Sequence, residues 1–332
     1  MPNLFSHMPG CQSDRRRLLP IAAIAAAAAL WIPTPFLLAQ QAPTPVHLNP
    51  VIEKLAEGKQ VFGVSTSDLS LDNARALARS PIDYVHVDME HSPMNFEALR
   101  VFTLGMIDKQ AILKKGNAQP NVALIARFAP YGREGSEWIV KQALDIGLMG
   151  VVFNGIDNKE QATMAVRNMR YPQKKGSPLS EPGGLRGFAP TNAVWLWGIP
   201  QPEYERHADV WPLNPNGDLL AVMMIETAEG LQNVDDIASV PGVGAIFVGV
   251  GGDLHQYLGV AQDSPEMEAA FQKILKACLA HNVACWKTVT AAEMPKRVRE
   301  GWKILGVGAA GSGGGLNADN DAALRAGRAV AK

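Results

Sequence analysis

Residues Val222–Gly259 read VMMIETAEGLQNVDDIASVPGVGAIFVGVGGDLHQYLG. Two apolar runs of strand length flank a helical segment, and the runs lead to two carboxylates, Glu226 and Asp253. Continuous Val, Ile and Met runs are typical of parallel strands covered by helices, and the chemistry of such folds lies at the carboxyl ends of the strands. This stretch therefore predicts two acids at the same end of two successive buried strands.

The same alternation of apolar runs and helical segments extends along the chain. Strands are predicted at residues 61–65, 84–88, 122–127, 150–153, 220–226, 245–248, 283–286 and 304–308. Helices are predicted at residues 73–78, 95–106, 138–144, 159–169, 235–240, 265–281, 291–300 and 321–331. These units predict a (β/α)8 TIM barrel. A doubly wound open sheet is the alternative, although no G-x-G-x-x-G follows the first predicted strand.

The N-terminal segment has the composition of an export signal. Three arginines at positions 15–17 precede an Ala-rich apolar stretch that two prolines interrupt, which predicts a signal peptide over residues 1–40 and no stable membrane span after its cleavage. Residues 14–19 resemble a twin-arginine signal, with Pro20 where such a signal usually carries lysine. We expect a periplasmic or secreted protein, and an uncleaved membrane anchor is the alternative.

The remaining chain suits one domain. Residues 41–50 are predicted to form a Pro-rich linker, and residues 51–332 a single TIM-barrel domain. Within it, residues 109–120 and 172–218 are long connections, which are usually lids, subunit contacts or disordered segments. Trp195, Trp197 and Trp211 favour a packed lid or an interface for the second connection.

Charge and cysteine content limit the possible partners. The formal net charge is -1, and no basic block recurs after position 17, so the electrostatic footprint of a nucleic-acid-binding protein is missing. Small molecules or further copies of the chain are the expected partners. Cys278 and Cys285 are predicted to be small buried apolar residues, and a single bridge between them is open if the protein is exported.

Ionisable residues follow two further predicted strands. Asp88 precedes His91 by three residues, so its carboxylate can fix the tautomer of the imidazole and raise its basicity. Arg127 closes the apolar run 122–126 at the same end of the barrel, where its guanidinium can hold a carboxylate or stabilise developing negative charge. A structural histidine and a structural salt bridge are the alternatives.

Glu226 and Asp253 supply only two protein oxygens. Such a pair suits Mg²⁺, which keeps water and substrate ligands, and Mn²⁺ accepts the same donors. Acids near a helix N-terminus are the alternative, which Glu229 and Asp235 fit better. The glycine-rich residues 306–315 after the last strand predict either a phosphate cradle or a flexible loop.

Several separated segments together resemble the HpcH/HpaI aldolases, metal-dependent class II enzymes that use pyruvate as the nucleophile. The matching pieces are Val87–His91, Ala126-Arg127, Lys141–Gly147, Arg170-Tyr171-Pro172, Arg186-Gly187 and Met224-Ile225-Glu226-Thr227 with Gly230 and Asn233. The resemblance implies a TIM barrel that assembles as a hexamer through exchanged C-terminal helices. It also implies reversible aldol cleavage of a 4-hydroxy-2-oxo acid into pyruvate and an aldehyde, through a metal-stabilised pyruvate enolate.

The resemblance implies roles for individual residues. Glu226 and Asp253 would bind the divalent ion, Mg²⁺ or Mn²⁺ with Co²⁺ as a further candidate. His91, oriented by Asp88, would transfer protons, and Arg127 would hold the pyruvate oxygens and the enolate. The glycines of the turn before Asp253, Gly251 and Gly252, are predicted to contact the substrate.

The chain departs from the family pattern in three places. One is the turn after the last strand, which is usually Gly-Ser-Asp-like in the family, whereas Ala309-Ala310-Gly311-Ser312 carries no acid. The turn Gly249–Asp253 lacks the proline that commonly precedes the metal-binding Asp and carries one additional residue, which is expected to displace the carboxylate. The insertion 172–218 is expected to remodel the mouth of the barrel. A citrate-lyase-β-like or malyl-CoA-type lyase and a non-catalytic exported binding protein on a degenerate barrel are the alternative functions.

Overall fold

In a computed structural model of the protein, eight parallel strands form a closed barrel. The structure describes residues 47–249, 253–311 and 314–331. The strands pair in the order β1-β2-β3-β4-β6-β7-β8-β9, and β9 pairs with β1, which closes the ring. The short strand β5 pairs only with β6. The barrel strands are β1 Val61–Thr66, β2 Tyr84–Met89, β3 Ala123–Tyr131, β4 Gly150–Asn154, β6 Leu219–Ile225, β7 Ala245–Val248, β8 Ala284–Thr288 and β9 Ile304–Ala309. The TIM-barrel prediction is confirmed.

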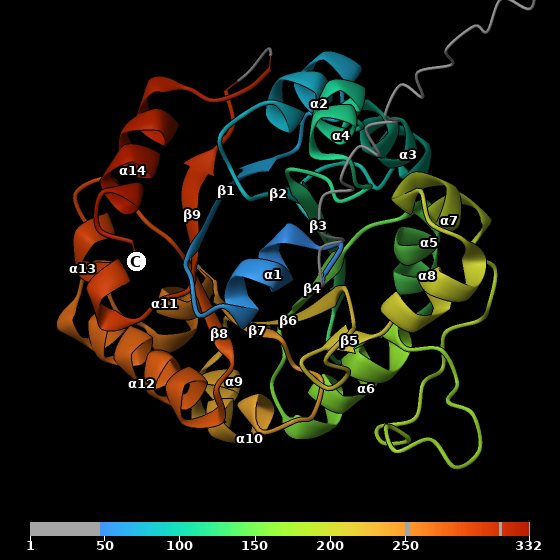
Figure 1. Cartoon of the computed structure of the whole chain (residues 1–332). Coiled ribbons are helices and arrows are strands. Elements are labelled where there is room, and N and C mark those ends of the chain that lie inside the picture. Colours follow the sequence, from blue (N-terminus) through green and yellow to red (C-terminus); the bar gives the residue numbers. More distant parts are fainter. Residues whose placement is uncertain (1–46, 250–252, 312–313, 332) are drawn as a thin grey trace, which may run out of the picture. The chain divides into compact units, whose positions relative to one another are not determined.

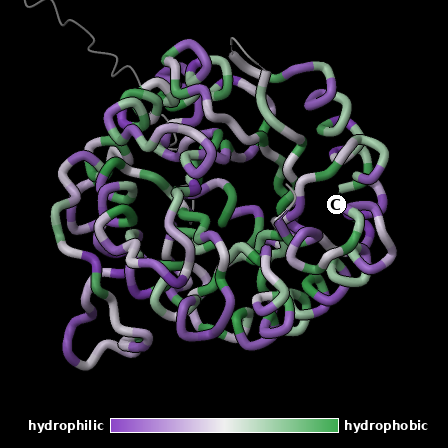
Figure 2. The backbone as a smooth tube through the Cα atoms, turned by 180° about the vertical axis from the view of Figure 1, so that it is seen from behind, coloured by the Kyte–Doolittle hydropathy of each residue, from purple (hydrophilic) through white to green (hydrophobic). Residues whose placement is uncertain are grey.

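Helices surround the strands, as Figure 1 shows. They are α2 Leu71–Ala78, α3 Phe96–Gly105, α4 Lys109–Lys115, α5 Glu137–Ile146, α6 Lys159–Met169, α7 Thr191–Trp197, α8 Gln201–His207, α9 Ala228–Gln232, α10 Val234–Ala238, α11 Asp253–Leu258, α12 Pro265–His281, α13 Met294–Glu300 and α14 Ala318–Arg328. Hydrophobic segments concentrate in the inner strands, and hydrophilic segments dominate the periphery (Figure 2). None of the helices in the described ranges is both long and apolar enough to cross a membrane.

The register of the strands determines which side chains fill the barrel. Tyr84 and His86 lie on the same face of β2, and both rings contact Trp286 of β8 at centroid distances of 4.9 and 5.3 Å. Gly63 makes room for this aromatic layer, because a Cβ atom there would come within 2.6 Å of the Tyr84 ring. Two residues further along the same face, Asp88 therefore points into the C-terminal mouth of the barrel.

The N-terminal end of the barrel is covered by α1 (Pro50–Ala56), which lies in the middle of the ring of strands in Figure 1. The buried carboxylate of Asp218 accepts hydrogen bonds from the backbone amides of Leu48 and Asn49, both at 3.1 Å. Asn49 also caps α1. The predicted linker 41–50 is therefore wrong over its described residues, 47–50, because they are buried and belong to the domain. The predicted signal peptide lies outside the described residues.

The two long connections contain helices, contrary to the expectation of loops. Residues 109–120 include α4, and residues 172–218 include α7, α8 and the two-residue strand β5, Val210–Trp211. Both connections follow a helix and precede a strand, so they lie at the N-terminal end of the barrel; β5 pairs with the first residues of β6. The expectation that the insertion 172–218 remodels the mouth is therefore corrected, because the mouth is at the opposite end.

The tryptophans of this insertion play different parts. Trp197 is buried, and its indole N–H donates to the backbone oxygen of Gly147 at 2.9 Å. Trp195 is 67% exposed. Among the described residues, no ring contact joins Trp195, Trp197 and Trp211 to one another. The insertion is packed from residue 190 onward, where Trp197, Tyr204 and Val210 are buried, whereas most of residues 173–189 are exposed or partly exposed. Its tryptophans do not form one cluster.

Cys278 of α12 and Cys285 of β8 form a disulfide that joins the helix to the outer face of the strand. Both residues are 1% exposed. The prediction of two buried side chains is confirmed, and the bridge that the sequence left open is formed.

Candidate active site

Arg127 is the centre of a charged cluster at the mouth of the barrel. Asp88 of β2 and Arg127 of β3 are direct neighbours in the strand register. One nitrogen of the guanidinium, Nη2, lies 2.5 Å from Asp88 Oδ2, and the other, Nη1, lies 2.9 Å from Glu90 Oε2. Nη1 also lies 3.6 Å from the sulfur of Met224. The guanidinium thus has a fixed position between two carboxylates.

His91 completes this cluster on its solvent side. Its side chain is 62% exposed, and its Nδ1 lies 3.2 Å from Asp88 Oδ2 and 3.0 Å from Arg127 Nη2. A guanidinium can only donate, so Nδ1 can accept from Arg127, or it can carry the proton and donate to Asp88. In either case the ring is anchored through Nδ1, and the other nitrogen, Nε2, is left for proton exchange. The structure thus brings the predicted residues Asp88, His91 and Arg127 together.

The pKa values of this cluster reflect its single positive charge. Burial raises the pKa of Asp88, but the hydrogen bond and charge of Arg127 outweigh it and lower the pKa to about 2. Burial raises the pKa of Glu90 above its usual value, although the charge of Arg127 opposes this. Asp88 is therefore a permanent carboxylate at neutral pH, suited to orienting an imidazole and unsuited to accepting its proton.

Glu226 lies beyond the last residue of β6 and is completely buried. Neither oxygen of its carboxylate has a well-formed hydrogen bond in the part of the chain that the structure describes. Burial, followed by the negative charges of Glu90 and Asp253, raises the pKa of Glu226 to about 7, although the backbone amide of Gly155 and the charge of Arg127 lower it in part. A buried acid that lacks a strong hydrogen bond is costly, which makes Glu226 a candidate ligand for a bound cation.

Asp253 is the first residue of α11 and is half-buried. Its charge raises the pKa of both Glu226 and Glu90, so its carboxylate faces the same cluster. Gly249, which precedes the turn, is required for the close approach of β7 to Glu226, because a Cβ atom there would lie 2.8 Å from the Glu226 Cβ. The predicted substrate-binding residues Gly251 and Gly252 lie outside the described residues.

The charge balance of the mouth is strongly negative. Four carboxylates, those of Asp88, Glu90, Glu226 and Asp253, share it with the guanidinium of Arg127. An anionic keto acid would be repelled by this excess unless a cation accompanied it. The unpartnered oxygens of Glu226, with Asp253 facing them, fit a divalent ion that takes carboxylate and water ligands. The chemistry of these donors suits a divalent ion, and the assignment of Glu226 and Asp253 as its ligands stays a prediction.

A second group of donors lies nearby. Side-chain atoms of Asp88, Glu90 and His91 all lie within 4.8 Å of one another, which is the spacing of a metal site. Arg127, however, already occupies the space between the two carboxylates with a positive charge. This group is therefore a poorer metal site than the side of the mouth that contains Glu226.

The sequence analysis did not assign two residues of the mouth. Glu90 forms an ion pair with Arg127, and its negative charge raises the pKa of Glu226. The sequence feature that could have marked Glu90 is its position between Asp88 and His91, directly after a predicted strand. Tyr131 ends β3, and burial followed by the charges of Glu226 and Glu90 raises its pKa. No pattern in the sequence marks Tyr131, because its proximity to these acids arises only from the fold.

The glycine-rich loop after β9 makes contacts of its own. The amide of Gly315 donates to the side chain of Asn73 at 3.1 Å, and the amide of Gly311 donates to the backbone oxygen of Gly315 at 2.9 Å. These two amides are therefore engaged within the protein. Residues 312–313 are not among the described residues, so a phosphate cradle here stays a prediction.

Comparison with known proteins agrees with this geometry. A sequence model of the HpcH/HpaI aldolase/citrate lyase family matches residues 66–312. The chain belongs to this family. It is 29% identical over 235 residues to the hydroxypyruvate/pyruvate aldolase of Paraburkholderia phytofirmans, an alignment that covers 69% of this chain and 78% of the relative. It is 32% identical over 221 residues to the 2-dehydro-3,6-dideoxy-6-sulfogluconate aldolase of Pseudomonas putida, with coverages of 66% and 74%.

Among solved structures, the barrel is similar to an HpcH/HpaI aldolase/citrate lyase family protein from Burkholderia cenocepacia J2315. The TM-score is 0.64 at 27% sequence identity, and the match covers 79% of this chain and 93% of the other. The family segment, residues 66–312, includes the whole charged cluster from Asp88 to Asp253.

Proposed function

We propose that this member of the HpcH/HpaI aldolase/citrate lyase family is a divalent-metal-dependent aldolase that cleaves a 4-hydroxy-2-oxo acid into pyruvate and an aldehyde. Family membership and the aldolase relatives support a carbon-carbon lyase. The observation that supports the metal-dependent form is the buried Glu226 carboxylate, which has no well-formed hydrogen bond among the described residues and lies in the field of the Asp253 and Glu90 charges. Mg²⁺ and Mn²⁺ suit these donors, and Co²⁺ is a further candidate.

Glu226 and Asp253 would hold the ion. When bound, it polarises the carbonyl of the keto acid and offsets the negative charge that develops on the carbonyl oxygen. It also reverses the repulsion that the carboxylates exert on an anionic substrate.

The residues of the chain supply positioning and proton transfer. With its Nδ1–H donating to Asp88, His91 takes the proton of the 4-hydroxyl group through Nε2 as the bond between C3 and C4 breaks. The electron pair of that bond remains on the pyruvate half as an enolate, and a proton is then delivered to C3. Arg127, fixed by Asp88 and Glu90, places its positive charge beside the forming enolate, where it stabilises charge that appears only along the reaction.

The negative charge of the mouth also helps to distinguish the aldolase from the two alternative functions. A coenzyme A thioester would bring several phosphate charges, which favour a basic mouth, whereas carboxylates predominate here. A binding protein that has lost turnover would not need the costly burial of Glu226. The geometry therefore favours the aldolase over the malyl-CoA-type lyase and the binding protein.

A direct test measures pyruvate release from a panel of 4-hydroxy-2-oxo acids with lactate dehydrogenase and NADH. Activity should require Mg²⁺, Mn²⁺ or Co²⁺, stop with a chelator and fall at least a hundredfold in Glu226→Ala. Glu160→Ala, at an exposed acid of α6, is the matched control and should keep full activity. Activity that ignores both the chelator and Glu226→Ala would refute the metal-dependent mechanism.

We also propose that the protein is exported and self-associates. The disulfide between Cys278 and Cys285 supports an oxidising compartment. The exposed aromatic side chains Phe188 and Trp195 of the insertion support an interface between copies. Cell fractionation and light scattering test these proposals. A reduced protein in the cytoplasm, or a monomer at micromolar concentration, would contradict them; a hexamer would agree with the family resemblance.

A further inference from the structure

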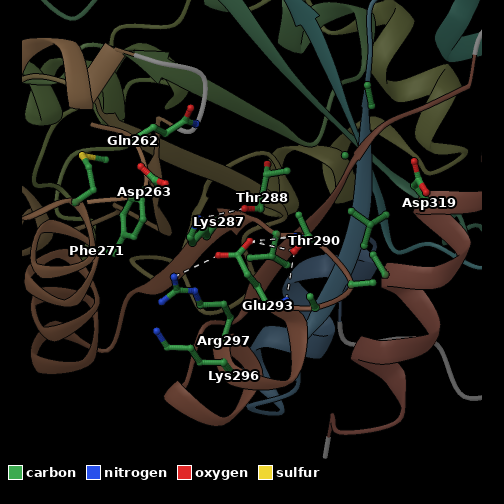
Figure 3. Close-up of a pocket in the computed structure, with 18 of the residues that line it drawn as sticks. Gln262, Asp263, Phe271, Lys287, Thr288, Thr290, Glu293, Lys296, Arg297 and Asp319 are labelled. Atoms are coloured by element: carbon green, nitrogen blue, oxygen red, sulfur yellow. Dashed lines mark hydrogen bonds and ion pairs between the residues drawn. The ribbon is translucent and has the colours of Figure 1, made fainter. Parts of the chain in front are cut away.

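A large groove lies on the outer side of β8, between α12, α13 and α14. Its volume is about 1140 Å³, and its walls include Phe271, Lys287, Arg297 and Asp319. Figure 3 shows Lys287 and Phe271 on one side of the groove and Asp319, from α14, on the other. One end of the groove reaches Gly249, but most of its lining comes from the layer between the strands and the helices.

Lys287 faces this groove and not the barrel interior. Its neighbour Trp286 packs inside the barrel against Phe247, with ring centroids 4.6 Å apart, so Lys287 is on the opposite face of β8. Its ammonium nitrogen lies 4.3 Å from the centroid of the Phe271 ring on α12. The site around Lys287 is therefore separate from the carboxylate cluster of the mouth.

Lys287 is a buried cation without an acidic partner. Lys287 is only 4% exposed, and its ammonium nitrogen donates a long hydrogen bond, 3.4 Å, to the backbone oxygen of Thr288. Within the described ranges, no carboxylate oxygen lies within ion-pair distance of its nitrogen. Burial lowers the pKa of Lys287, although the charge of Glu293 raises it. An ammonium group has three hydrogens to donate, and the bond to Thr288 uses one of them.

The nearby acids are already used by other cations. Arg297 lies 2.7 Å from Glu268, 3.1 Å from Glu300 and 3.4 Å from Glu293. Lys296 shares Glu268 at 3.0 Å. An ion pair for Lys287 would therefore have to come from outside these residues, and burying an ammonium group without one is unfavourable.

The remaining lining restricts what such a partner can be. Phe271 and Met267 present apolar surface beside Lys287. Asp263 and Asp319 also line the groove and would repel a second negative charge. We propose that this groove binds a small monocarboxylic acid, with its carboxylate on Lys287 and its apolar body over Phe271. This binding site does not depend on the aldolase proposal.

Calorimetry with hexanoate and hexanamide tests the proposal, using the full protein with a chelator so that the mouth holds no metal. Hexanoate should bind, and the uncharged hexanamide should bind at least tenfold more weakly, because a hydrogen bond to a charged group is lost. Lys287→Gln should weaken hexanoate binding at least tenfold. Lys276→Gln, at an exposed lysine of α12, is the matched control and should leave it unchanged.

Three results would overturn the proposal. They are no binding of hexanoate to the unmodified protein, equal binding of the acid and the amide, or full binding by a folded Lys287→Gln variant, which would assign the acid to another site. If Lys287→Gln does not fold, a crystal of the unmodified protein soaked with 4-bromophenylacetate decides the matter. The anomalous signal of bromine should lie beside Phe271, and bromine elsewhere, or absent, would contradict the site.

Discussion

Replacing Glu226 by Gln is expected to stabilise the metal-free protein and, at the same time, to remove its activity. The carboxylate is completely buried, and burial together with the charges of Glu90 and Asp253 raises its pKa from 4.5 to about 7. A raised pKa in the folded state means that folding favours the protonated form. The stability contributed by the protonated Glu226 side chain is therefore fully present below about pH 4.5 and is lost as the pH rises through about 7.

The difference between 4.5 and about 7 corresponds to roughly 3 kcal/mol of unfolding free energy, at about 1.4 kcal/mol per pH unit. Urea denaturation with a chelator, from about pH 3.5 to about pH 8.5, measures it. The unfolding free energy of wild type should fall relative to Glu226→Gln by roughly this amount across the range. Glu160→Gln should follow wild type. Parallel curves for wild type and Glu226→Gln would refute a buried, unpaired carboxylate in the mouth.

Further predictions concern other parts of the structure. Arg127→Gln leaves Asp88 and Glu90 without their cation, so we expect a loss of roughly 3 kcal/mol in urea denaturation and of at least a hundredfold in pyruvate release; retained activity would contradict its role. Burial and then the charge of Arg127 lower the pKa of His86 from 6.5 to about 3. The stability that the neutral imidazole contributes is therefore present above pH 6.5 and is lost as the pH falls through about 3. In His86→Phe the unfolding free energy should fall less over this pH range than in wild type. Cys278→Ser with Cys285→Ser should cost roughly 2 kcal/mol of unfolding free energy, because a short loop is no longer closed in the unfolded chain; an unchanged melting temperature would contradict a formed bridge.

The barrel could be predicted from the sequence because most strand residues are buried, so that the strands read as short, largely apolar runs between helical segments. The position of Asp88 and Arg127 beside each other also follows from this pattern, since both lie at the carboxyl ends of the predicted runs 84–88 and 122–127, although β3 continues to Tyr131. Helix α4 was missed because none of its residues is buried, so it has no apolar periodicity. Its caps were the available signal, Asp108 before it and Gly116, with positive φ, after it.

Other features depend on tertiary contacts that no local pattern contains. The insertion 172–218 was placed at the mouth because of its length, whereas its position between a helix and a strand determines that it lies at the opposite end. The ion pair of Glu90 with Arg127 depends on how the turn after β2 folds back over β3. Lys287 has no ion pair because the nearby acids of α12 and α13 already form three ion pairs with Lys296 and Arg297.

The central claim is that Glu226 and Asp253 hold a metal ion that enolises pyruvate. Proton NMR of the pyruvate methyl group in D₂O tests it most directly, because the exchange requires enolisation and does not require knowledge of the aldehyde. Exchange should need Mg²⁺, Mn²⁺ or Co²⁺ and should be lost in Glu226→Gln and Asp253→Asn, while Glu160→Gln keeps it. Exchange that persists in both variants, or that proceeds at full rate with a chelator, would contradict the account.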